Sequence, residues 1–521
     1  MPHLAPLASS LALFSSITFS QLHAAEPFRA QAGHIVLVVW DGMRPDFITP
    51  EGTPTLHALA QSGTFFNHNH SVYITSTEVN GTAIATGSYP TNNGILANRE
   101  FRPSIDPLKP FGTENAQAVQ LGDATRGGKY VKLATLAELV QKAGHRTAIA
   151  GTKPVALLHD RAPQKPLGSA VLFAGKSYPE DFARQIAEKI GPFPDYPALG
   201  TLAPNTAQNA WTTRALVEEL WKDGVPKFST LWMGDPDFTQ HLTQPGSPTA
   251  LAAIRDSDRN LATLLAALEA KGVRGKTDVF VVSDHGFSTV DRTVDLPAIF
   301  QAAGFTLVRE YKAPPQPGEV LLISLGGTCQ LYVPDHDEAL VRRLVAFLQT
   351  SDFCGPIMTR TALPGTFTLH DARIDSPDSA DIVFSFRWRD DKNPWGAPGT
   401  FVAEGRKPGF GTHASLSRFD IRNTLVAAGP DIRAGFIDEL PTANVDIAPT
   451  ILHLLGITPP EARDGRILRE ALAGVKWDAP VPERTVLEAR TASWRQYLHL
   501  TKLGKWTYLD EGNAENVPEA K

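Results

Sequence analysis

The chain has 521 residues, of which 42% are hydrophobic and 20% are charged, and its formal net charge at neutral pH is −6. This length and apolar content are enough for a large buried core. The acidic balance and the lack of a basic run argue against a nucleic-acid surface or an anionic membrane as partner, and favour small soluble ligands.

The N-terminus has the composition of a signal peptide. Residues 4–19 are apolar or small and carry no charge, and Ala24 and Ala25 precede a polar stretch. We therefore predict a signal peptide over residues 1–25 and a periplasmic or secreted location. A short buried or anchoring helix is the alternative, because no Lys or Arg precedes the run. The run is too short and serine-rich to predict integral membrane association.

Three apolar runs lead into acidic and imidazole side chains. His34–Trp40 ends on Asp41, Phe228–Met233 leads into GDPDFTQH, and Asp278–Val282 leads into SDHGF. Parallel strands deliver functional groups in this way to one edge of a sheet. The clearest helix, Pro248–Lys271, follows the second run. We predict an α/β fold with a mostly parallel, doubly wound sheet.

Two further helices are predicted at Leu133–Lys142 and Thr442–Leu455, from their apolar periodicity. Asp256 and Asp258 on the Pro248–Lys271 helix could be considered as metal ligands. We interpret them instead as solvated or as contacts from the helix to a loop.

Six candidate metal ligands are spread over nearly four hundred residues. They are Asp41, Asp237, His241, Asp284, His285 and His413. Zinc takes imidazole nitrogen and carboxylate oxygen, and a catalytic ion keeps one position open. Two such ions about 4 Å apart can hold the attacking and leaving oxygens of a phosphoryl transfer. A single Asp after a strand is more commonly a cap or turn residue. Several acid and imidazole pairs at strand ends are hard to explain by capping, and they predict a two-metal hydrolase.

The spacing of these residues sets local requirements. Asp237 and His241 are four apart and meet on one side if their segment is helical. Asp284 and His285 are adjacent and reach one ion only if the backbone bends sharply, for which Gly286 is suited. His413 lies in the glycine-rich PGFGTHAS and is predicted to be a loop ligand.

A hydroxyl at the start of a predicted helix is the candidate nucleophile. Small residues occur at helical density over Thr77–Thr86 and are followed by Gly and Pro stop signals. Thr77 would lie in the positive field of the helix N-terminus, and a bound metal would lower the pKa of its hydroxyl. Asn80, one turn on, is placed to donate to a phosphoryl oxygen. Ser76 is a weaker alternative nucleophile, and an N-cap role for Thr77 stays open.

Several pieces of the chain, in this order, resemble the alkaline phosphatase superfamily, and most of all its nucleotide pyrophosphatase/phosphodiesterase branch. The pieces are VVWDGMRPD, STEVNGTAIATGSYPTNNGI, DPDFTQH, VVSDHGF and GTHAS, with NVDIAPTILHLLGI similar to the closing helix of the core. The resemblance covers roughly residues 34–470. It implies an alkaline-phosphatase-like, mostly parallel central sheet with helices on both faces and a smaller inserted cap subdomain.

The resemblance also implies two Zn²⁺ ions per subunit and a small phosphoester substrate. The two ligand sets are Asp237, His241 and His413, and Asp41, Asp284 and His285 with Thr77 bound to the second ion. In that family the threonine attacks phosphorus to give a covalent phospho-threonine, which water then hydrolyses. Asn80 would steady a non-bridging oxygen. The implied activity is that of a phosphodiesterase or nucleotide pyrophosphatase.

One departure from the family affects the substrate. Nucleotide-cleaving members usually have an aromatic residue and then Pro after the nucleophile, and this chain has Glu78 and Val79. A carboxylate there would disfavour polyanions or meet a cationic head group, unless Glu78 only complements the helix dipole. Nucleotide preference is therefore left open.

The residues around Thr77 also bear on the other activities of the superfamily. The Cys or Ser motif that sulfatases need is absent around Thr77. A phosphomonoesterase would present a cation to the extra charge, and Lys153 and Arg44 are candidates, although either can be an ordinary solvated cation. Phosphonate hydrolysis is a minor alternative. A non-catalytic binding protein would lack a ligand or the nucleophile, and none is missing.

The domain prediction follows from the interleaved ligands. One catalytic domain must span residues 26–521, with a lid loop at 97–130 and a cap insertion at about 287–400. Cys329 and Cys354 form one disulfide or are two buried thiols. The oligomeric state is left open.

Overall fold

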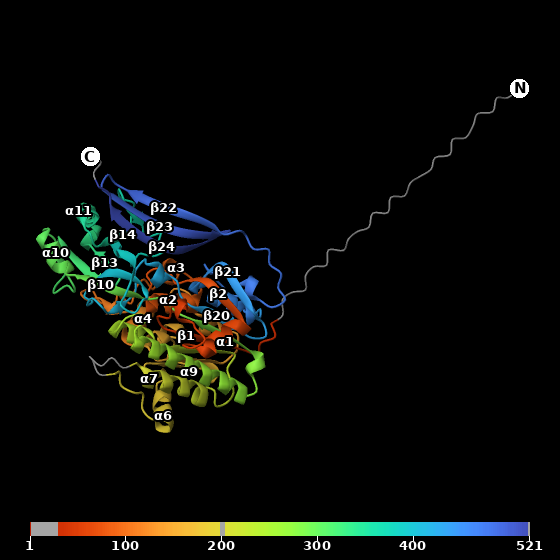
Figure 1. Ribbon diagram of the computed structural model, residues 1–521. Helices are drawn as coiled ribbons and strands as arrows, with labels where there is room; N and C mark the ends of the chain where they lie inside the picture. The colour runs from red at the N-terminus through yellow and green to blue at the C-terminus, as the bar shows by residue number, and fades with distance from the viewer. Residues whose placement is uncertain (2–29, 198–203, 519–521) are drawn as a thin grey trace.

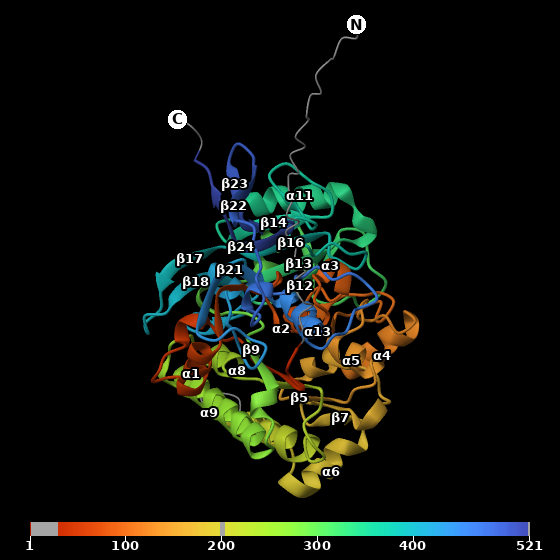
Figure 2. The same cartoon turned by 90° about the vertical axis from the view of Figure 1, so that its right-hand side faces the viewer.

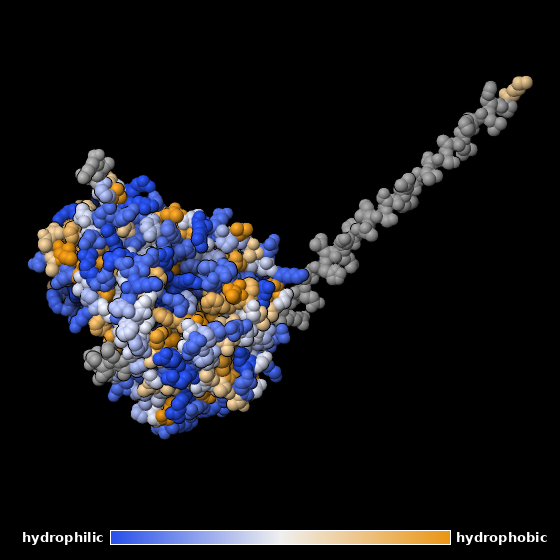
Figure 3. Space-filling view, viewed as in Figure 1, coloured by the Kyte–Doolittle hydropathy of each residue, from blue (hydrophilic) through white to orange (hydrophobic). Residues whose placement is uncertain are grey.

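The computed structural model describes residue 1 and residues 30–197 and 204–518. The predicted signal peptide at 1–25 lies outside the described residues, apart from Met1. No helix among the described residues is long and apolar enough to span a membrane. The face seen in Figure 3 is mainly hydrophilic, with apolar residues in small separate patches.

A nine-stranded sheet forms the centre of the molecule (Figure 1). In sheet order its strands are β21 (Phe436–Ala443), β2 (Thr64–His70), β20 (Leu425–Ala428), β9 (Thr277–Val282), β1 (His34–Trp40), β8 (Phe228–Met233), β5 (Thr147–Gly151), β6 (Ala170–Phe173) and β7 (Lys176–Tyr178). β1 pairs in parallel with both β8 and β9, and β5 in parallel with β8 and β6. β20 and β7 are antiparallel to their neighbours. The predicted mostly parallel α/β sheet is confirmed.

Strand β1 is buried on both faces, which explains its unbroken apolar sequence. Ile35, Leu37 and Val39 point into one core, with α5 (Leu136–Lys142) and α13 (Ile447–Leu454). The alternate residues Val36 and Val38 point into a second core with α1 (Pro54–Ser62) and α9 (Pro248–Ala270). Helices therefore cover both faces of the sheet (Figure 2).

The helix that carries the candidate nucleophile begins and ends where the sequence predicts. α2 spans Thr77–Thr86 and ends at Gly87, whose φ of 72° is the left-handed conformation that glycine adopts readily. The predicted helix Thr442–Leu455 begins too early, because Thr442 and Ala443 pair with β2 as the end of β21. α13 starts at Ile447, since tertiary strand pairing outweighs the local helical pattern.

The segment 287–400 contributes most of two sheets outside the central one (Figure 1). One contains β11 (Thr306–Val308), β12 (Glu319–Ser324), β13 (Thr328–Tyr332), β16 (Ile382–Phe386), β14 (Cys354–Thr359) and β15 (Phe367–Thr368); the other contains β17 (Trp388–Lys392), β18 (Pro398–Glu404), β10 (Ser288–Val294) and β19 (Gly411–Thr412). Helix α11 (Glu338–Thr350) packs in the core of this region.

Two regions differ from the expected organisation. The predicted lid loop contains the short β3 (Arg99–Glu100) and β4 (Phe111–Gly112) and a helix, α4 (Ala116–Thr125), whose N-terminus is capped by Asn115. The chain also ends in a three-stranded sheet of β22 (Glu483–Arg490), β23 (Trp494–Leu503) and β24 (Trp506–Asn516). In that sheet Gln496 hydrogen-bonds both backbone groups of Ile357 in β14, which ties it to the 287–400 region.

The two cysteines and the two acids of α9 are buried in the packed protein. Cys329 and Cys354 are free, buried thiols on β13 and β14, which are separated by β16. Asp258 accepts hydrogen bonds from the amides of Thr55 and Leu56 at the start of α1, so it is a helix-to-loop contact as interpreted. Asp256 is buried beside Arg259, so the solvated alternative is wrong for it.

Candidate active site

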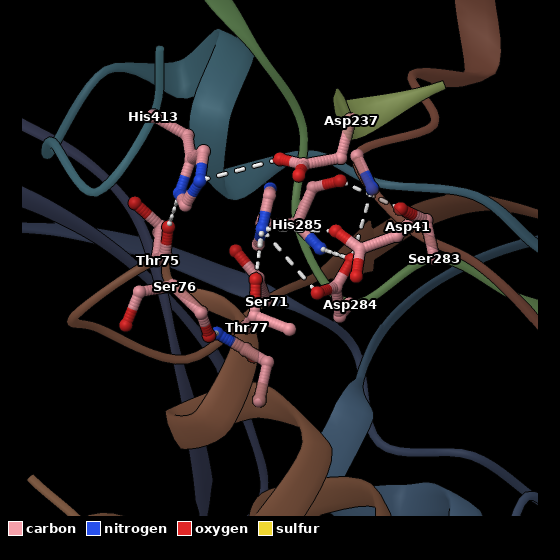
Figure 4. A network of polar contacts seen from close by, with 12 residues as sticks. Asp41, Ser71, Thr75, Ser76, Thr77, Asp237, Ser283, Asp284, His285 and His413 are labelled. Atoms are coloured by element: carbon pink, nitrogen blue, oxygen red, sulfur yellow. Dashed lines mark hydrogen bonds and ion pairs between the residues drawn. The ribbon is translucent and has the colours of Figure 1, made fainter. Parts of the chain in front are cut away.

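The carboxyl ends of three adjacent central strands place acidic groups close together. Asp41 follows β1, Asp284 follows β9, and Asp237 begins the short helix α8 (Asp237–Leu242) after β8. His413 arrives from the loop after β19. Figure 4 shows their side chains converging above the N-terminal end of α2. The structure therefore brings together residues that are nearly four hundred positions apart in sequence.

The first group of possible ligands is Asp237, His241 and His413, whose ligand atoms all lie within 4.8 Å of one another. Asp237 Oδ1 is 3.2 Å from His241 Nε2 and 3.4 Å from His413 Nε2. α8 produces this geometry, because residues four apart on a helix lie on the same side.

The second group is centred on His285. Its Nε2 is 3.3 Å from Asp284 Oδ2 and 3.7 Å from Asp41 Oδ1. The ligand atoms within 4.8 Å of one another are those of Asp41, Asp237 and His285. Asp237 is thus within reach of both groups, a proximity that sequence spacing did not indicate.

All three imidazoles turn the same nitrogen toward the carboxylates. The Nδ1 atoms of His241, His285 and His413 lie 3.2, 2.9 and 2.8 Å from the carbonyl oxygens of Gly411, Gly286 and Thr75, respectively. A carbonyl oxygen only accepts, so each Nδ1 carries the proton. The Nε2 lone pairs then face the acids, as metal-binding histidines require.

Burial fixes the charge state of two of these rings. It lowers the pKa of His285 to about 4 and that of His413 to about 3. Both are therefore neutral at pH 7, which is the form that binds a metal.

The donor set fits divalent cations. Asp41 Oδ1, Asp237 Oδ1 and Asp284 Oδ2 are buried and accept no hydrogen bond from any described residue. They face imidazole nitrogens that are also acceptors, so acceptor meets acceptor unless a cation lies between them. Burial, and then the charge of Asp284, raises the pKa of Asp41 well above its usual range. A bound cation would offset the repulsion between these facing acceptor atoms and the unfavourable burial of the carboxylate charges.

Lys153 supplies the protein's own positive charge at this place. It follows β5, and its Nζ is 3.0 Å from both Asp41 Oδ2 and Asp237 Oδ2. The same Nζ is 3.4 Å from Thr77 Oγ1. Of the two cations considered from the sequence, Lys153 reaches the site. Arg44 does not, because it is buried against Asp46 and donates to the carbonyls of Phe287 and Pro398.

Thr77 is the first residue of α2 and does not cap it. Ser76 occupies the N-cap position, and neither hydroxyl makes a capping hydrogen bond. Thr77 Oγ1 instead lies 3.4 Å from His285 Nε2. The hydroxyl thus faces both the ligand cluster and the positive end of the helix.

Asn80 is held in a way that the sequence did not indicate. Its Nδ2 donates to the carbonyls of Val72, Ile74 and Ser76 at 3.0, 3.3 and 3.2 Å, and its Oδ1 accepts from the amide of Val72. These contacts leave no amide hydrogen for a substrate. Asn80 is fully buried and fixes the loop before Thr77.

Asn98 brings a side-chain amide to the site that the sequence did not indicate. Its Oδ1 accepts from the backbone N–H of Glu78 at 3.1 Å, beside the nucleophile. Asn98 also lines a cavity with His241 and His413, and its Nδ2 has no hydrogen-bond partner among the described residues. Only its position in the fold distinguishes it from other asparagines, because it is 21 residues from Thr77.

Two other residues at the site, Glu78 and Gly286, are in closely packed surroundings. Glu78 is buried, and burial followed by the nearby Glu114 carboxyl raises its pKa well above the usual range. Glu78 is an acid of the first turn of α2, as the helix-dipole alternative requires. The Gly286 backbone packs closely against the backbone of Phe419. Glycine is required at this position, because a Cβ would collide with the Phe419 carbonyl oxygen.

Comparison with known proteins agrees with this arrangement. The family model of type I phosphodiesterase / nucleotide pyrophosphatase matches residues 35–389. The chain belongs to this family. The phosphodiesterase family match spans β1 to β17 and therefore includes all the site residues described above except His413.

Individual relatives of the phosphodiesterase family are distant. Human ectonucleotide pyrophosphatase/phosphodiesterase family member 5 is 24% identical over 304 residues, 57% of this chain and 53% of that protein. Bis(5′-adenosyl)-triphosphatase enpp4 of Xenopus laevis is 22% identical over 287 residues, 54% of each protein. The chain spans about half the length of these relatives. The solved murine family member 5 matches with a TM-score of 0.59 at 18% identity, covering 84% of this chain and all of that one. That likeness shows a shared fold.

Proposed function

We propose that this chain is a two-zinc phosphoesterase, and that it acts as a phosphodiesterase or nucleotide pyrophosphatase through Thr77. The observation that carries the proposal is the place of the Thr77 hydroxyl. It lies at the N-terminus of α2 and 3.4 Å from His285 Nε2, at the edge of the carboxylate and imidazole cluster. Membership of the phosphodiesterase family supports the same activity.

The residues that would hold the two ions are those of the two groups. They are Asp237, His241 and His413 for one ion, and Asp41, Asp284 and His285, with Thr77, for the other. Bound zinc would supply Lewis acidity to the phosphoryl oxygens and lower the pKa of the Thr77 hydroxyl. The Asp237 carboxylate lies within reach of both groups and would be placed to contribute to either site.

The residues of the chain would have separate roles in the reaction. Thr77 Oγ1 loses its proton and forms a bond to phosphorus while the bond to the leaving oxygen breaks. The leaving oxygen keeps the electron pair and takes up a proton from water. The N-terminus of α2 and the Asn98 amide would stabilise the negative charge on the non-bridging oxygens. In a second displacement water would attack the phosphorus held on Thr77, return a proton to the threonine oxygen and release the phosphate monoester. The Nδ1 contacts of His285 and His413 hold both rings in place throughout.

The two asparagines should respond differently to replacement. Asn98→Ala should lower kcat about 10²-fold, the usual cost of losing one oxyanion donor, and should lower the melting temperature only slightly, because one hydrogen bond to the Glu78 N–H is lost. Asn80→Ala should destabilise the fold by on the order of 2–4 kcal/mol, because it strips a buried loop of several hydrogen bonds. Steady-state kinetics and thermal unfolding of both variants separate the two roles. A normal kcat for Asn98→Ala would remove this residue from the mechanism.

A phosphomonoesterase is the second candidate, and Lys153 is the observation that favours it. Its ammonium lies beside the nucleophile, where it would complement the extra negative charge of a monoester. Hydrolysis of bis(p-nitrophenyl) phosphate, p-nitrophenyl phosphate and p-nitrophenyl sulfate should be compared. We expect the diester to have the highest kcat/KM. A much faster monoester would establish the second candidate, and hydrolysis of the sulfate alone would contradict both.

We also propose a periplasmic or secreted location. The composition of residues 1–25 and the name of the human ectonucleotide relative support it.

A further inference from the structure

A cavity of about 440 Å³ lies at the C-terminal end of α13. Its wall is formed by the end of that helix, the loop 457–467 that follows it, Trp477, and Trp506 at the start of β24. None of the candidate metal ligands lines it, and neither does Thr77. The cavity is therefore separate from the proposed reaction centre, and its volume is in the range of small-molecule sites.

Much of the cavity wall is apolar. Leu452, Ile457 and Ile467 contribute aliphatic side chains to it, and Trp477 and Trp506 contribute indole rings. Both tryptophans are half-buried, so part of each side chain is still open to solvent. An aromatic ring buries a large apolar area when a ligand covers it. The wall therefore suits a ligand with an apolar body.

The charged residues of the wall all have the same sign. Arg463, Arg466 and Arg469 line the cavity, and no acid is found among its described lining residues. Arg466 is already engaged, because its guanidinium donates to the Glu470 carboxylate and to the Tyr508 hydroxyl. Arg469 is exposed and forms no ion pair within the part of the chain that the structure describes. Positive charge thus remains available at the cavity.

Arg463 is the residue that points most directly to a ligand. Its side chain is only 3% exposed, and its Nη2 donates to the Ala134 carbonyl at 3.0 Å, with a Glu461 carboxylate oxygen 3.9 Å away. The other two nitrogens, Nε and Nη1, are buried and have no hydrogen-bond partner among the described residues. Unmet donors on a buried cation are unfavourable. An anion in the cavity would satisfy them with charge-assisted hydrogen bonds.

We propose that this cavity is a second binding site, which takes an organic anion with an apolar body. The anionic group would accept hydrogen bonds from Arg463 and lie in the field of Arg469, and the apolar body would cover Trp477 and Trp506. Binding is non-covalent and requires no reaction at Thr77.

The test compares three probes that separate charge from apolar area. 2-Naphthoate has both, 2-naphthylmethanol has the apolar rings without the charge, and acetate has the charge without the rings. Each is titrated into the purified full chain by isothermal titration calorimetry at pH 7. We expect 2-naphthoate to bind at least about tenfold more tightly than either of the other two, because only it meets both the buried arginine and the indole rings.

Three substitutions locate the bound 2-naphthoate. Arg463→Gln should raise its Kd about tenfold, the usual effect of losing a hydrogen bond to a charged group. Arg469→Gln changes an exposed residue and so keeps the fold, and it should raise the Kd about threefold, because the charge lost is partly solvated. Trp477→Leu should raise the Kd about fivefold through the loss of aromatic contact area.

Two control variants exclude other places for the probe. Arg184→Gln removes an exposed arginine of α6 (Asp181–Ile190), which is not among the cavity residues, and should leave the Kd unchanged. His413→Ala alters the ligand cluster, where a carboxylate could bind a metal. It should also leave the Kd unchanged, since His413 does not line this cavity.

Three results would overturn the proposal. The first is equal affinity for 2-naphthoate and 2-naphthylmethanol, which would show that the arginines do not contribute. The second is an unchanged Kd in Arg469→Gln and in folded Arg463→Gln. The third is a loss of 2-naphthoate binding in His413→Ala with full binding in Trp477→Leu, which would place the probe at the ligand cluster.

Discussion

Thr77→Ala is expected to lower kcat/KM for bis(p-nitrophenyl) phosphate by at least about 10³-fold, because removal of a catalytic nucleophile leaves only binding and charge stabilisation. Thr77 Oγ1 is the hydroxyl that faces His285 Nε2 and Lys153 Nζ, each at 3.4 Å. The measurement is steady-state kinetics on purified protein, with circular dichroism to show that α2 remains folded.

Matched variants distinguish loss of the nucleophile from damage to its helix. Thr82→Ala removes a hydroxyl from the same helix that donates only to the Glu78 carbonyl, and it should keep nearly full activity. Thr77→Ser keeps a hydroxyl at the same place and should retain measurable turnover. If Thr77→Ala kept more than about a tenth of the activity, the covalent mechanism would be wrong.

Removal of metal should have an effect of similar size. Treatment with a strong chelator is expected to lower activity at least about 10³-fold, and added Zn²⁺ should restore it. Chelation should also lower the melting temperature, because a ligand that binds only the folded state stabilises it. The buried carboxylate oxygens of Asp41, Asp237 and Asp284, which accept no hydrogen bond, give the physical reason.

Metal content provides a readout that does not depend on activity. Elemental analysis should find about two zinc ions per chain, and about one in His241→Ala. His145→Ala removes an exposed histidine after α5 and should leave the content unchanged. Full activity after verified removal of all metal would contradict the proposed centre.

The sequence predicted the position of a site residue correctly where that residue directly follows a strand. β1, β8 and β9 begin and end within a residue of the apolar runs, and parallel pairing then brings Asp41, Asp237 and Asp284 together without further information. The spacing of Asp237 and His241 predicted the helical turn that α8 provides. These features depend on local periodicity and on a general property of parallel sheets.

Features that depend on how distant segments pack were not predictable in the same way. Asn80 has the spacing of a residue one turn from Thr77, but its side chain turns back to the preceding loop. Asn98 reaches the site only because the chain folds back after α3 (Pro90–Asn93). The cavity lined by Asn98, His241 and His413 also has residues of the 287–400 region in its wall, so it forms only when these distant segments pack together.

The stereochemical course at phosphorus tests the central claim most directly. A chiral phosphorothioate diester hydrolysed in ¹⁸O-labelled water reports the number of displacements, since each in-line displacement inverts the configuration. Attack by Thr77 followed by attack by water is two displacements, so the account predicts overall retention. Inversion would show that water attacks directly, and would contradict a covalent intermediate on Thr77.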